Sequence, residues 1–155
     1  MLTRFGANWG KVTLATVGAR AHYEYRAVGD PVNTASRIQE LNKKFDTRIL
    51  VSQSLIAGVE GFALRDLGLF LLRGKKTPER IFELIHNEAL VTAAQLELMS
   101  EFGKALQILH SGEQAAALAA FQHVRARHPF DGATAFYIEL LLTGKPLPGN
   151  VVVLD

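Results

Sequence analysis

Apolar positions in the first part of the chain alternate between the two-residue period of strands and the 3.6-residue period of helices. Val12 and Leu14 alternate with polar neighbours, which is typical of a half-buried strand. Ile38, Leu41 and Phe45 recur at spacings of three and four, which predicts a helix with one buried stripe. The first elements predicted in this way are the end of a strand before a turn at 8–10 and two strands at 12–17 and 23–28, joined by a loop at 18–21. A helix at 31–44, a strand at 48–51 and a helix at 53–59, capped by Ser52, follow. An extended segment at 62–72 and a strand at 80–85 complete this part. This order predicts a mixed α/β unit.

The pattern becomes purely helical after residue 86. Helical spacing of apolar residues is interrupted at Ser111–Gly112 and stops before Pro129; a third helix is predicted at 132–142. The two helices before Pro129 fit either one tetratricopeptide-like unit or a helical hairpin packed on the α/β part. Residues 151–154 are apolar and fit an edge strand. We therefore divide the chain into an α/β domain at 1–87, a helical extension at 88–146 and a short apolar tail at 147–155.

Composition narrows the functional classes. The chain has 155 residues, of which 48% are hydrophobic and 21% charged, as in a soluble globular protein. The net charge of +2, without a run of Lys or Arg, gives no indication of nucleic-acid binding. The absence of cysteine excludes disulfides, thiolate catalysis and Cys-ligated zinc. No apolar run approaches the ~18 residues that span a bilayer, and no signal-peptide pattern is found. We expect a cytoplasmic protein, or the cytosolic part of a membrane-anchored parent.

The candidate site lies where a strand stops at Gly29 and a helix follows at once. Asp30 is the predicted N-cap, with Pro31 at the first helical position. Asn33 and Arg37 are four residues apart and therefore share one face of the opening turns. An amide and a guanidinium near a helix N-terminus suit an anionic ligand such as a polyphosphate. The alternative is an ordinary helix start with a solvated polar face.

The segment Tyr25–Arg37 closely resembles the signature of class III adenylate/guanylate cyclase catalytic domains, roughly Y-x-A-[IV]-G-D-x-V-N-x-A-[SA]-R. Flanking blocks agree with that family in order and spacing: Gly10–Thr13, Thr16–Gly18, Thr47–Ser52, and Arg65–Gly68 with Leu72–Lys75. The resemblance implies an α/β fold of the α+β, ferredoxin-like nucleotide cyclase type, truncated at its N-terminal side and followed by a C-terminal α-helical hairpin extension. The helical tail is similar to the tetratricopeptide-like extension of many bacterial members.

The resemblance also implies an activity and roles for individual residues. Members are phosphorus–oxygen lyases that convert ATP or GTP to the 3′,5′-cyclic nucleotide and pyrophosphate, with two Mg²⁺ or Mn²⁺ ions, between two subunits of a dimer. Asn33 would orient the ribose, and Arg37 would neutralise charge on the α-phosphate. Arg73 or Lys75 would contact the terminal phosphates, and the sequence leaves open which of the two does so. Both belong to a basic turn at residues 73–78, for which the alternative is a solvated basic loop.

Two departures from the family pattern affect the predicted site. Arg26 stands at the position where the family reads the purine base. Its guanidinium only donates hydrogen bonds, so it cannot accept one from the adenine amino group. The choice between ATP and GTP therefore stays open. The two metal-binding aspartates of the family have no counterpart in the sequence, because Asp30, Asp46 and Asp66 stand in other contexts. No metal ligand is therefore predicted, and the sheet is expected to have a bare edge.

The sequence thus predicts an adenylate cyclase-type domain of cyclic-nucleotide signalling that carries only the transition-state half of the site. Its catalytic residues would be Asn33 and Arg37, and its substrate-binding residues Arg26, Asp30, Arg73 and Lys75. It would act in a homodimer or heterodimer with a cyclase domain. The alternative is a catalytically inactive interaction or regulatory module whose helical extension binds a protein partner.

Overall fold

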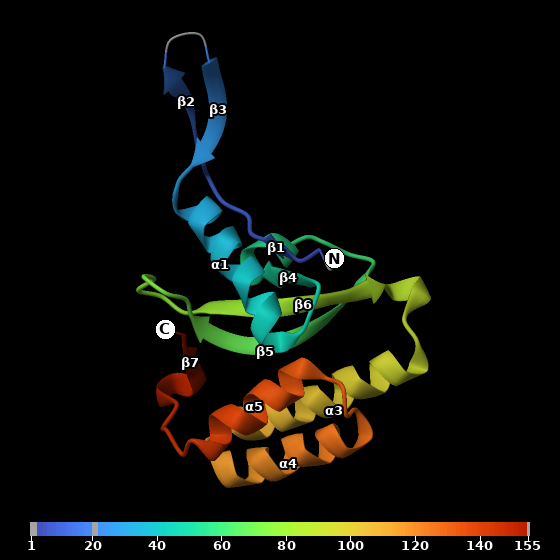
Figure 1. The fold of residues 1–155 in the computed structure, drawn as a ribbon. Coiled ribbons are helices and arrows are strands. Elements are labelled where there is room, and N and C mark those ends of the chain that lie inside the picture. Colours follow the sequence, from blue (N-terminus) through green and yellow to red (C-terminus); the bar gives the residue numbers. More distant parts are fainter. Residues whose placement is uncertain (1–2, 20–21, 155) are drawn as a thin grey trace.

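The elements of this chain follow the predicted order, as a computed structural model that describes residues 3–19 and 22–154 shows (Figure 1). The strands are β1 (Phe5–Ala7), β2 (Thr13–Ala19), β3 (His22–Val28), β4 (Ile49–Ser52), β5 (Phe62–Leu71), β6 (Glu79–Asn87) and β7 (Val151–Val153). The helices are α1 (Asp30–Phe45), α2 (Gln53–Ile56), α3 (Ala93–His110), α4 (Gln114–Arg127) and α5 (Gly132–Leu142), with 3₁₀ turns η1 (Glu88–Leu90) and η2 (Pro148–Asn150). The order β-β-β-α-β-α-β-β predicted for the first part is confirmed.

The main sheet has five strands in the order β1-β4-β6-β5-β7. The central pairs β4–β6 and β6–β5 are antiparallel, whereas the edge strands β1 and β7 run parallel to their neighbours. β7 places Val151–Val153 beside Leu69–Leu71, so the apolar tail does form the predicted edge strand. The mixed α/β architecture is compatible with a ferredoxin-like cyclase fold.

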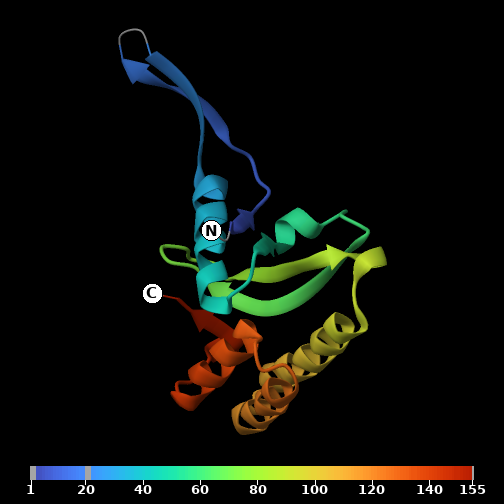
Figure 2. The same ribbon diagram turned by 45° about the vertical axis from the view of Figure 1, so that its right-hand side comes forward.

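β2 and β3 form a separate two-stranded sheet, which projects from the body as a long hairpin in both views (Figures 1 and 2). The two strands were predicted correctly, but the expectation of a half-buried strand was wrong. Leu14 is 72% exposed, and Val12 and Val17 are also exposed, because no other element of the described chain covers the hairpin. The predicted loop at 18–21 was wrong in part: Gly18–Ala19 belong to β2, and residues 20–21 lie outside the described residues.

One hydrophobic core joins α1, the main sheet and the three C-terminal helices. The predicted stripe of Ile38, Leu41 and Phe45 is buried, as expected. The ring of Phe45 makes edge contacts with Phe70 of β5 and Phe136 of α5, with centroids 5.4 and 4.9 Å apart. α1 and α5 therefore pack against each other and against the same part of the sheet.

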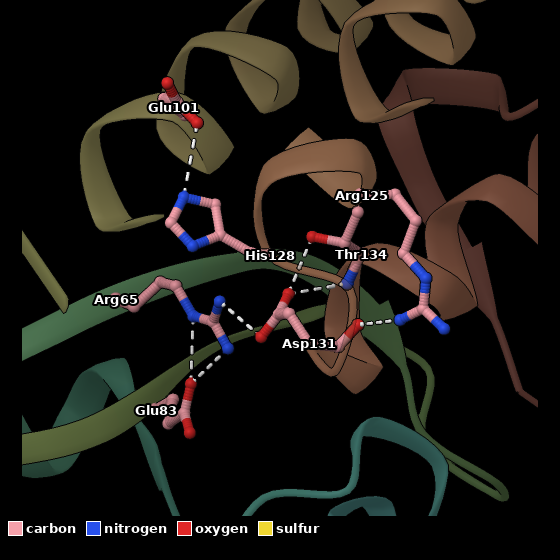
Figure 3. Close-up of polar contacts among 7 residues, drawn as sticks. All are labelled: Arg65, Glu83, Glu101, Arg125, His128, Asp131 and Thr134. Carbon is pink, nitrogen blue, oxygen red and sulfur yellow. Dashed lines mark hydrogen bonds and ion pairs between the residues drawn. The ribbon is translucent and has the colours of Figure 1, made fainter. Parts of the chain in front are cut away.

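A buried ionic network attaches the helices to the sheet (Figure 3). Arg65 on β5 donates through Nε and Nη2 to Glu83 of β6, and through Nη1 to Asp131 at 2.8 Å. Asp131 also caps α5, because its other carboxylate oxygen accepts from the amide and hydroxyl of Thr134. The Arg65 guanidinium lies 4.9 Å from the ring centroid of Phe102 on α3. Burial raises the pKa of the Glu83 carboxyl, against the lowering effect of Arg65. The helices and the sheet thus share one buried interface.

The ends of helices α2 and α3 show details that the sequence did not predict. The helix expected at 53–59 ends at Ile56, and Ser52 makes no capping hydrogen bond, because its hydroxyl donates to Asn8 Oδ1 at 2.7 Å. Thr92 and Gln95 form a capping box at the start of α3. None of the described helices is long and apolar enough to cross a membrane.

Candidate functional site

The helix start that carries the candidate residues is organised by Gly29, and the prediction that Asp30 is the N-cap was wrong. Gly29 occupies the N-cap position with φ 142°, a conformation that glycine adopts far more readily than other residues. Its carbonyl oxygen accepts from the amides of Val32 and Asn33 at 3.2 and 3.4 Å. Asp30 is the first helical residue, and no side chain makes a cap hydrogen bond. Pro31 was predicted at the first helical position and is the second helical residue instead, one place after Asp30, still within the first turn.

The carboxylate of Asp30 is instead paired with the basic turn between β5 and β6. Lys75 Nζ contacts Asp30 Oδ2 and also donates to Thr34 Oγ1 at 2.9 Å. Thr34 is buried and donates to the carbonyl oxygen of Asp30 at 2.9 Å. These contacts hold the turn against the first turn of α1. Lys75 is largely covered, with 14% of its side chain exposed, and its charge is already balanced by a carboxylate.

Arg37, one turn further along α1, lies over the same basic turn. A Cβ atom at Gly74 would lie 3.4 Å from Arg37 Nη2, so the guanidinium is close to the turn backbone. Arg37 and Arg73 line one hollow of about 110 Å³, together with Glu40, Leu41, Lys44, Leu72 and Leu154. Among the residues described, neither Arg37 nor Arg73 takes part in an ion pair. Within residues 3–19 and 22–154 the hollow therefore presents two guanidinium groups that form no ion pair, with the carboxylate of Glu40 also in its lining.

The remaining predicted residues lie around this hollow or apart from it. Asn33 is exposed on the opening turn of α1, one turn before Arg37. Arg26 is on β3 of the projecting hairpin, where it donates to Glu24 at 3.0 and 2.7 Å, and it does not line the hollow. The structure brings Arg37 and Arg73 together, places Lys75 beside Asp30 and leaves Arg26 outside this group.

Five residues that line the hollow were not predicted as site residues: Glu40, Leu41, Lys44, Leu72 and Leu154. Lys44 belongs to the polar stripe of α1 at helical spacing from Arg37, so the sequence did indicate that the two residues share one face of the helix. Leu154 had no such signal, because its place depends on the pairing of β7 with β5.

The acidic residues do not assemble into a metal site in the described ranges, 3–19 and 22–154. No group of three or more His, Asp or Glu side chains is placed there to hold an ion. The aspartates in question are occupied by other contacts: Asp30 with Lys75, Asp46 with Arg4, and Asp66 with Arg80 and the amide of Gly68. These residues therefore do not fit the metal pair that the resemblance implies.

Comparison with known proteins yields relatives with a shared name. No protein-family model matches the chain. Adenylate cyclase 1 of Rhizobium meliloti (strain 1021) is 36% identical over 84 residues, which cover 54% of this chain and 13% of that protein. The terminal-differentiation specific adenylate cyclase of Dictyostelium discoideum is 31% identical over 144 residues, 88% of this chain and 7% of that protein. An adenylate cyclase of Anabaena cylindrica is 32% identical over 83 residues, 51% of this chain and 16% of that protein.

The three matches cover different lengths of this chain and only a small part of each relative. The chain spans less than a fifth of the length of each of these relatives. The Dictyostelium match is too long to be confined to the α/β part, so it includes residues of the helical extension. Together with the mixed α/β fold, the similarities indicate that the chain contains a domain related to adenylate cyclases.

Proposed function

We propose that this chain supplies Asn33 and Arg37 to a composite adenylate cyclase-type site, in which ATP is converted to 3′,5′-cyclic AMP and pyrophosphate. The observation that carries the proposal is the hollow beside the first turns of α1, where Arg37 and Arg73 lie together and form no ion pair with any acidic residue that the structure describes. Guanidinium groups bind phosphate oxygens in a bidentate manner, so a pair of them suits a polyphosphate. The relatives named adenylate cyclase support the assignment to nucleotide chemistry.

In this proposal each side chain has a role that its position supports. The oxygen of the ribose 3′-hydroxyl attacks the α-phosphorus and its proton passes to water, while the bond from that phosphorus to the pyrophosphate oxygen breaks. Arg37 neutralises the negative charge that builds up on the α-phosphate oxygens, which a preorganised guanidinium does at little reorganisation cost. Asn33, one turn earlier on the same face, hydrogen-bonds the ribose and fixes the orientation of its 3′-hydroxyl.

The contacts support a division of labour in the basic turn that the sequence left open. Arg73 lines the hollow with Arg37 and is exposed, so we assign it the terminal phosphates. Lys75 is bound to Asp30 and Thr34, so we assign it and Asp30 the positioning of the turn. A phosphate that recruited Lys75 would first have to separate it from the Asp30 carboxylate.

The second half of the site would come from a second cyclase domain, in a homodimer or a heterodimer. The described acidic residues of this chain do not fit the Mg²⁺ or Mn²⁺ pair, so we place the metal ligands on that domain. When bound, such ions activate the attacking hydroxyl and clamp charge at the phosphates. The exposed apolar side chains of the projecting hairpin, including Leu14 and Tyr25 at 72% and 80% exposure, support a protein interface there.

Titration of the purified chain with ATP and with inorganic tripolyphosphate, followed by calorimetry, tests the hollow directly. Arg37→Ala and Arg73→Ala should each weaken binding about tenfold or more, because one hydrogen bond to a charged group contributes about 1.5–3 kcal/mol and each ~1.4 kcal/mol corresponds to tenfold. Arg48→Ala is the matched control, because Arg48 is an exposed arginine that does not line this hollow. Equal affinities for the three variants and the unmodified chain would contradict the proposal.

Arg26 favours a second candidate function, a cyclase-like interaction module without catalysis. A donor-only side chain at the base-reading position suits adenine poorly, and Arg26 is paired with Glu24. In this version the α/β part docks on an intact cyclase domain, and the helical extension, tetratricopeptide-like in this proposal, binds a protein partner. Arg37→Ala would then leave docking and cyclic AMP formation unchanged. Parallel titrations with ATP and GTP show which base, if either, the chain prefers.

A further inference from the structure

The C-terminal strand β7 lies alongside the segment that carries Arg73. β7 runs parallel to the end of β5, with Val153 opposite Leu71, and the amide of Leu154 donates to the carbonyl of Leu71 at 3.1 Å. β5 continues directly into Leu72 and Arg73 of the basic turn. The position of β7 is therefore coupled to that of the turn by backbone hydrogen bonds.

Leu154 is also part of the wall of the hollow. It lines the hollow that contains Arg37 and Arg73, and it lines an adjoining open hollow of about 510 Å³ beside Gly74 and Lys75. An apolar wall beside guanidinium groups excludes water and strengthens their attraction for a phosphate. If β7 moved away from β5, the hollow would lose this wall.

The other end of β7 is attached to the helical unit, by which we mean α3, α4 and α5. In the 3₁₀ turn after α5, Asn150 Nδ2 donates to the carbonyl oxygen of His110, the last residue of α3, at 2.9 Å. Val152 is 1% exposed and belongs to the same core as α3 and α5. Tyr137 of α5 donates from its buried hydroxyl to the carbonyl of Leu67 on β5. A rearrangement of the helices would therefore act on β7 and on β5 together.

We propose that β7 is a strap through which the helical unit controls the phosphate-binding hollow. The proposal rests on the proposed function and adds its regulation. With β7 paired, the end of β5 is held in register and Leu154 closes one side of the hollow. With β7 displaced, Arg73 and the hollow lose this support. A strand of three residues at the edge of a sheet, with one fully buried side chain, is the kind of element that opens before the rest of a fold.

Two valines that differ in burial provide the test. Val152 of β7 is buried in the core, whereas Val59, after α2, is 43% exposed and lines neither hollow, so Val152→Asn should release β7 and Val59→Asn should not. Neither substitution changes the charge near the hollow. We expect Val152→Asn to weaken tripolyphosphate binding about three- to tenfold, up to the ~1.4 kcal/mol that corresponds to tenfold. Val59→Asn should remain within about twofold, as for an ordinary surface substitution. Hydrogen exchange at residues 69–71 should be faster only in Val152→Asn.

A crosslink separates release of the strand from general damage to the core. Leu69 and Val151 are register partners on β5 and β7, and the chain contains no cysteine, so Leu69→Cys with Val151→Cys can form one defined disulfide. The two cysteines are then combined with Val152→Asn. The oxidised triple variant should bind tripolyphosphate as tightly as the unmodified chain, and the reduced form should bind it as weakly as Val152→Asn.

The outcomes distinguish this inference from the proposed function. Faster exchange at residues 69–71 without a change in affinity would overturn the strap, and so would unchanged exchange in Val152→Asn. Failure of the crosslink to restore binding would do the same. If the unmodified chain does not bind tripolyphosphate at all, the proposed function itself fails and the inference falls with it, while hydrogen exchange still reports the state of β7.

Discussion

Replacing Asp131 with asparagine tests how strongly the helical unit is attached to the sheet. Asparagine is as good an N-cap as aspartate, so the start of α5 keeps its acceptor for the Thr134 amide. The substitution removes the charge that faces Arg65 Nη1 at 2.8 Å. It therefore separates the ionic contact from the cap, which a change to alanine would remove together.

The expected magnitude follows from burial. Only 3% of the Arg65 side chain and 9% of the Asp131 side chain are exposed, so solvent does little to compensate the lost pair. Removing one partner of a buried pair typically costs about 3–5 kcal/mol. Because Glu83 remains bound to Arg65, we expect the lower end of that range, about 3 kcal/mol.

Urea unfolding followed by far-ultraviolet circular dichroism measures this loss. Glu97→Gln is the control, because Glu97 pairs with Arg127 where the two side chains are 47% and 44% exposed. An exposed pair contributes about 0–1 kcal/mol, so the control should unfold close to the unmodified chain. If Asp131→Asn lost no more free energy of unfolding than Glu97→Gln, the network would not be what attaches the helices.

Three further predictions concern single side chains. Tyr137→Phe leaves a carbonyl of β5 without its buried donor and should cost about 1–3 kcal/mol in urea unfolding; unchanged stability would refute this bond. Gly74→Ala places a Cβ 3.4 Å from Arg37, at φ +68°, and should weaken tripolyphosphate binding in calorimetry. Gly58→Ala, at φ +89° with no neighbour within 4 Å of the added Cβ, is the control and should leave binding unchanged. Equal effects of the two substitutions would refute the contact between the turn and Arg37. Burial lowers the pKa of His110 from its usual 6.5, so below that pH the unfolded chain binds more protons and stability should fall as pH falls. Between pH 7.5 and 5.5 the free energy of unfolding, measured with urea, should fall less in His110→Gln than in the unmodified chain. An equal fall in the two proteins would contradict this role of His110.

The parts of the fold that depend on local pattern could be predicted from the sequence. The helix at 132–142 has the bounds expected from its flanking glycine and its apolar run, and the stripe of Ile38, Leu41 and Phe45 is buried. The apolar tail was predicted as an edge strand, although its partner β5 was not. Periodicity and turn residues are properties of neighbouring positions, so they are visible without the fold.

The features that were missed depend on residues far apart in the chain. The exposure of Leu14 depends on the hairpin having no covering layer, which alternation along one strand does not reveal. Asp30 looked like a helix cap because Lys75, its actual partner, comes from a turn 45 residues away. The contact of Arg65 with Asp131 likewise joins positions 66 residues apart. Such pairings follow from the tertiary arrangement, not from local sequence.

The most direct test of the central claim is a mixed assay of cyclic AMP formation. The chain is combined, with Mg²⁺ or Mn²⁺, with a cyclase domain that carries the metal-binding aspartates but has lost its own arginine at the position of Arg37. We predict that neither protein alone forms cyclic AMP, that the mixture does, and that Arg37→Ala in this chain abolishes the activity whereas Arg48→Ala does not. Robust activity from this chain alone, or a mixture that is insensitive to Arg37→Ala, would contradict the account.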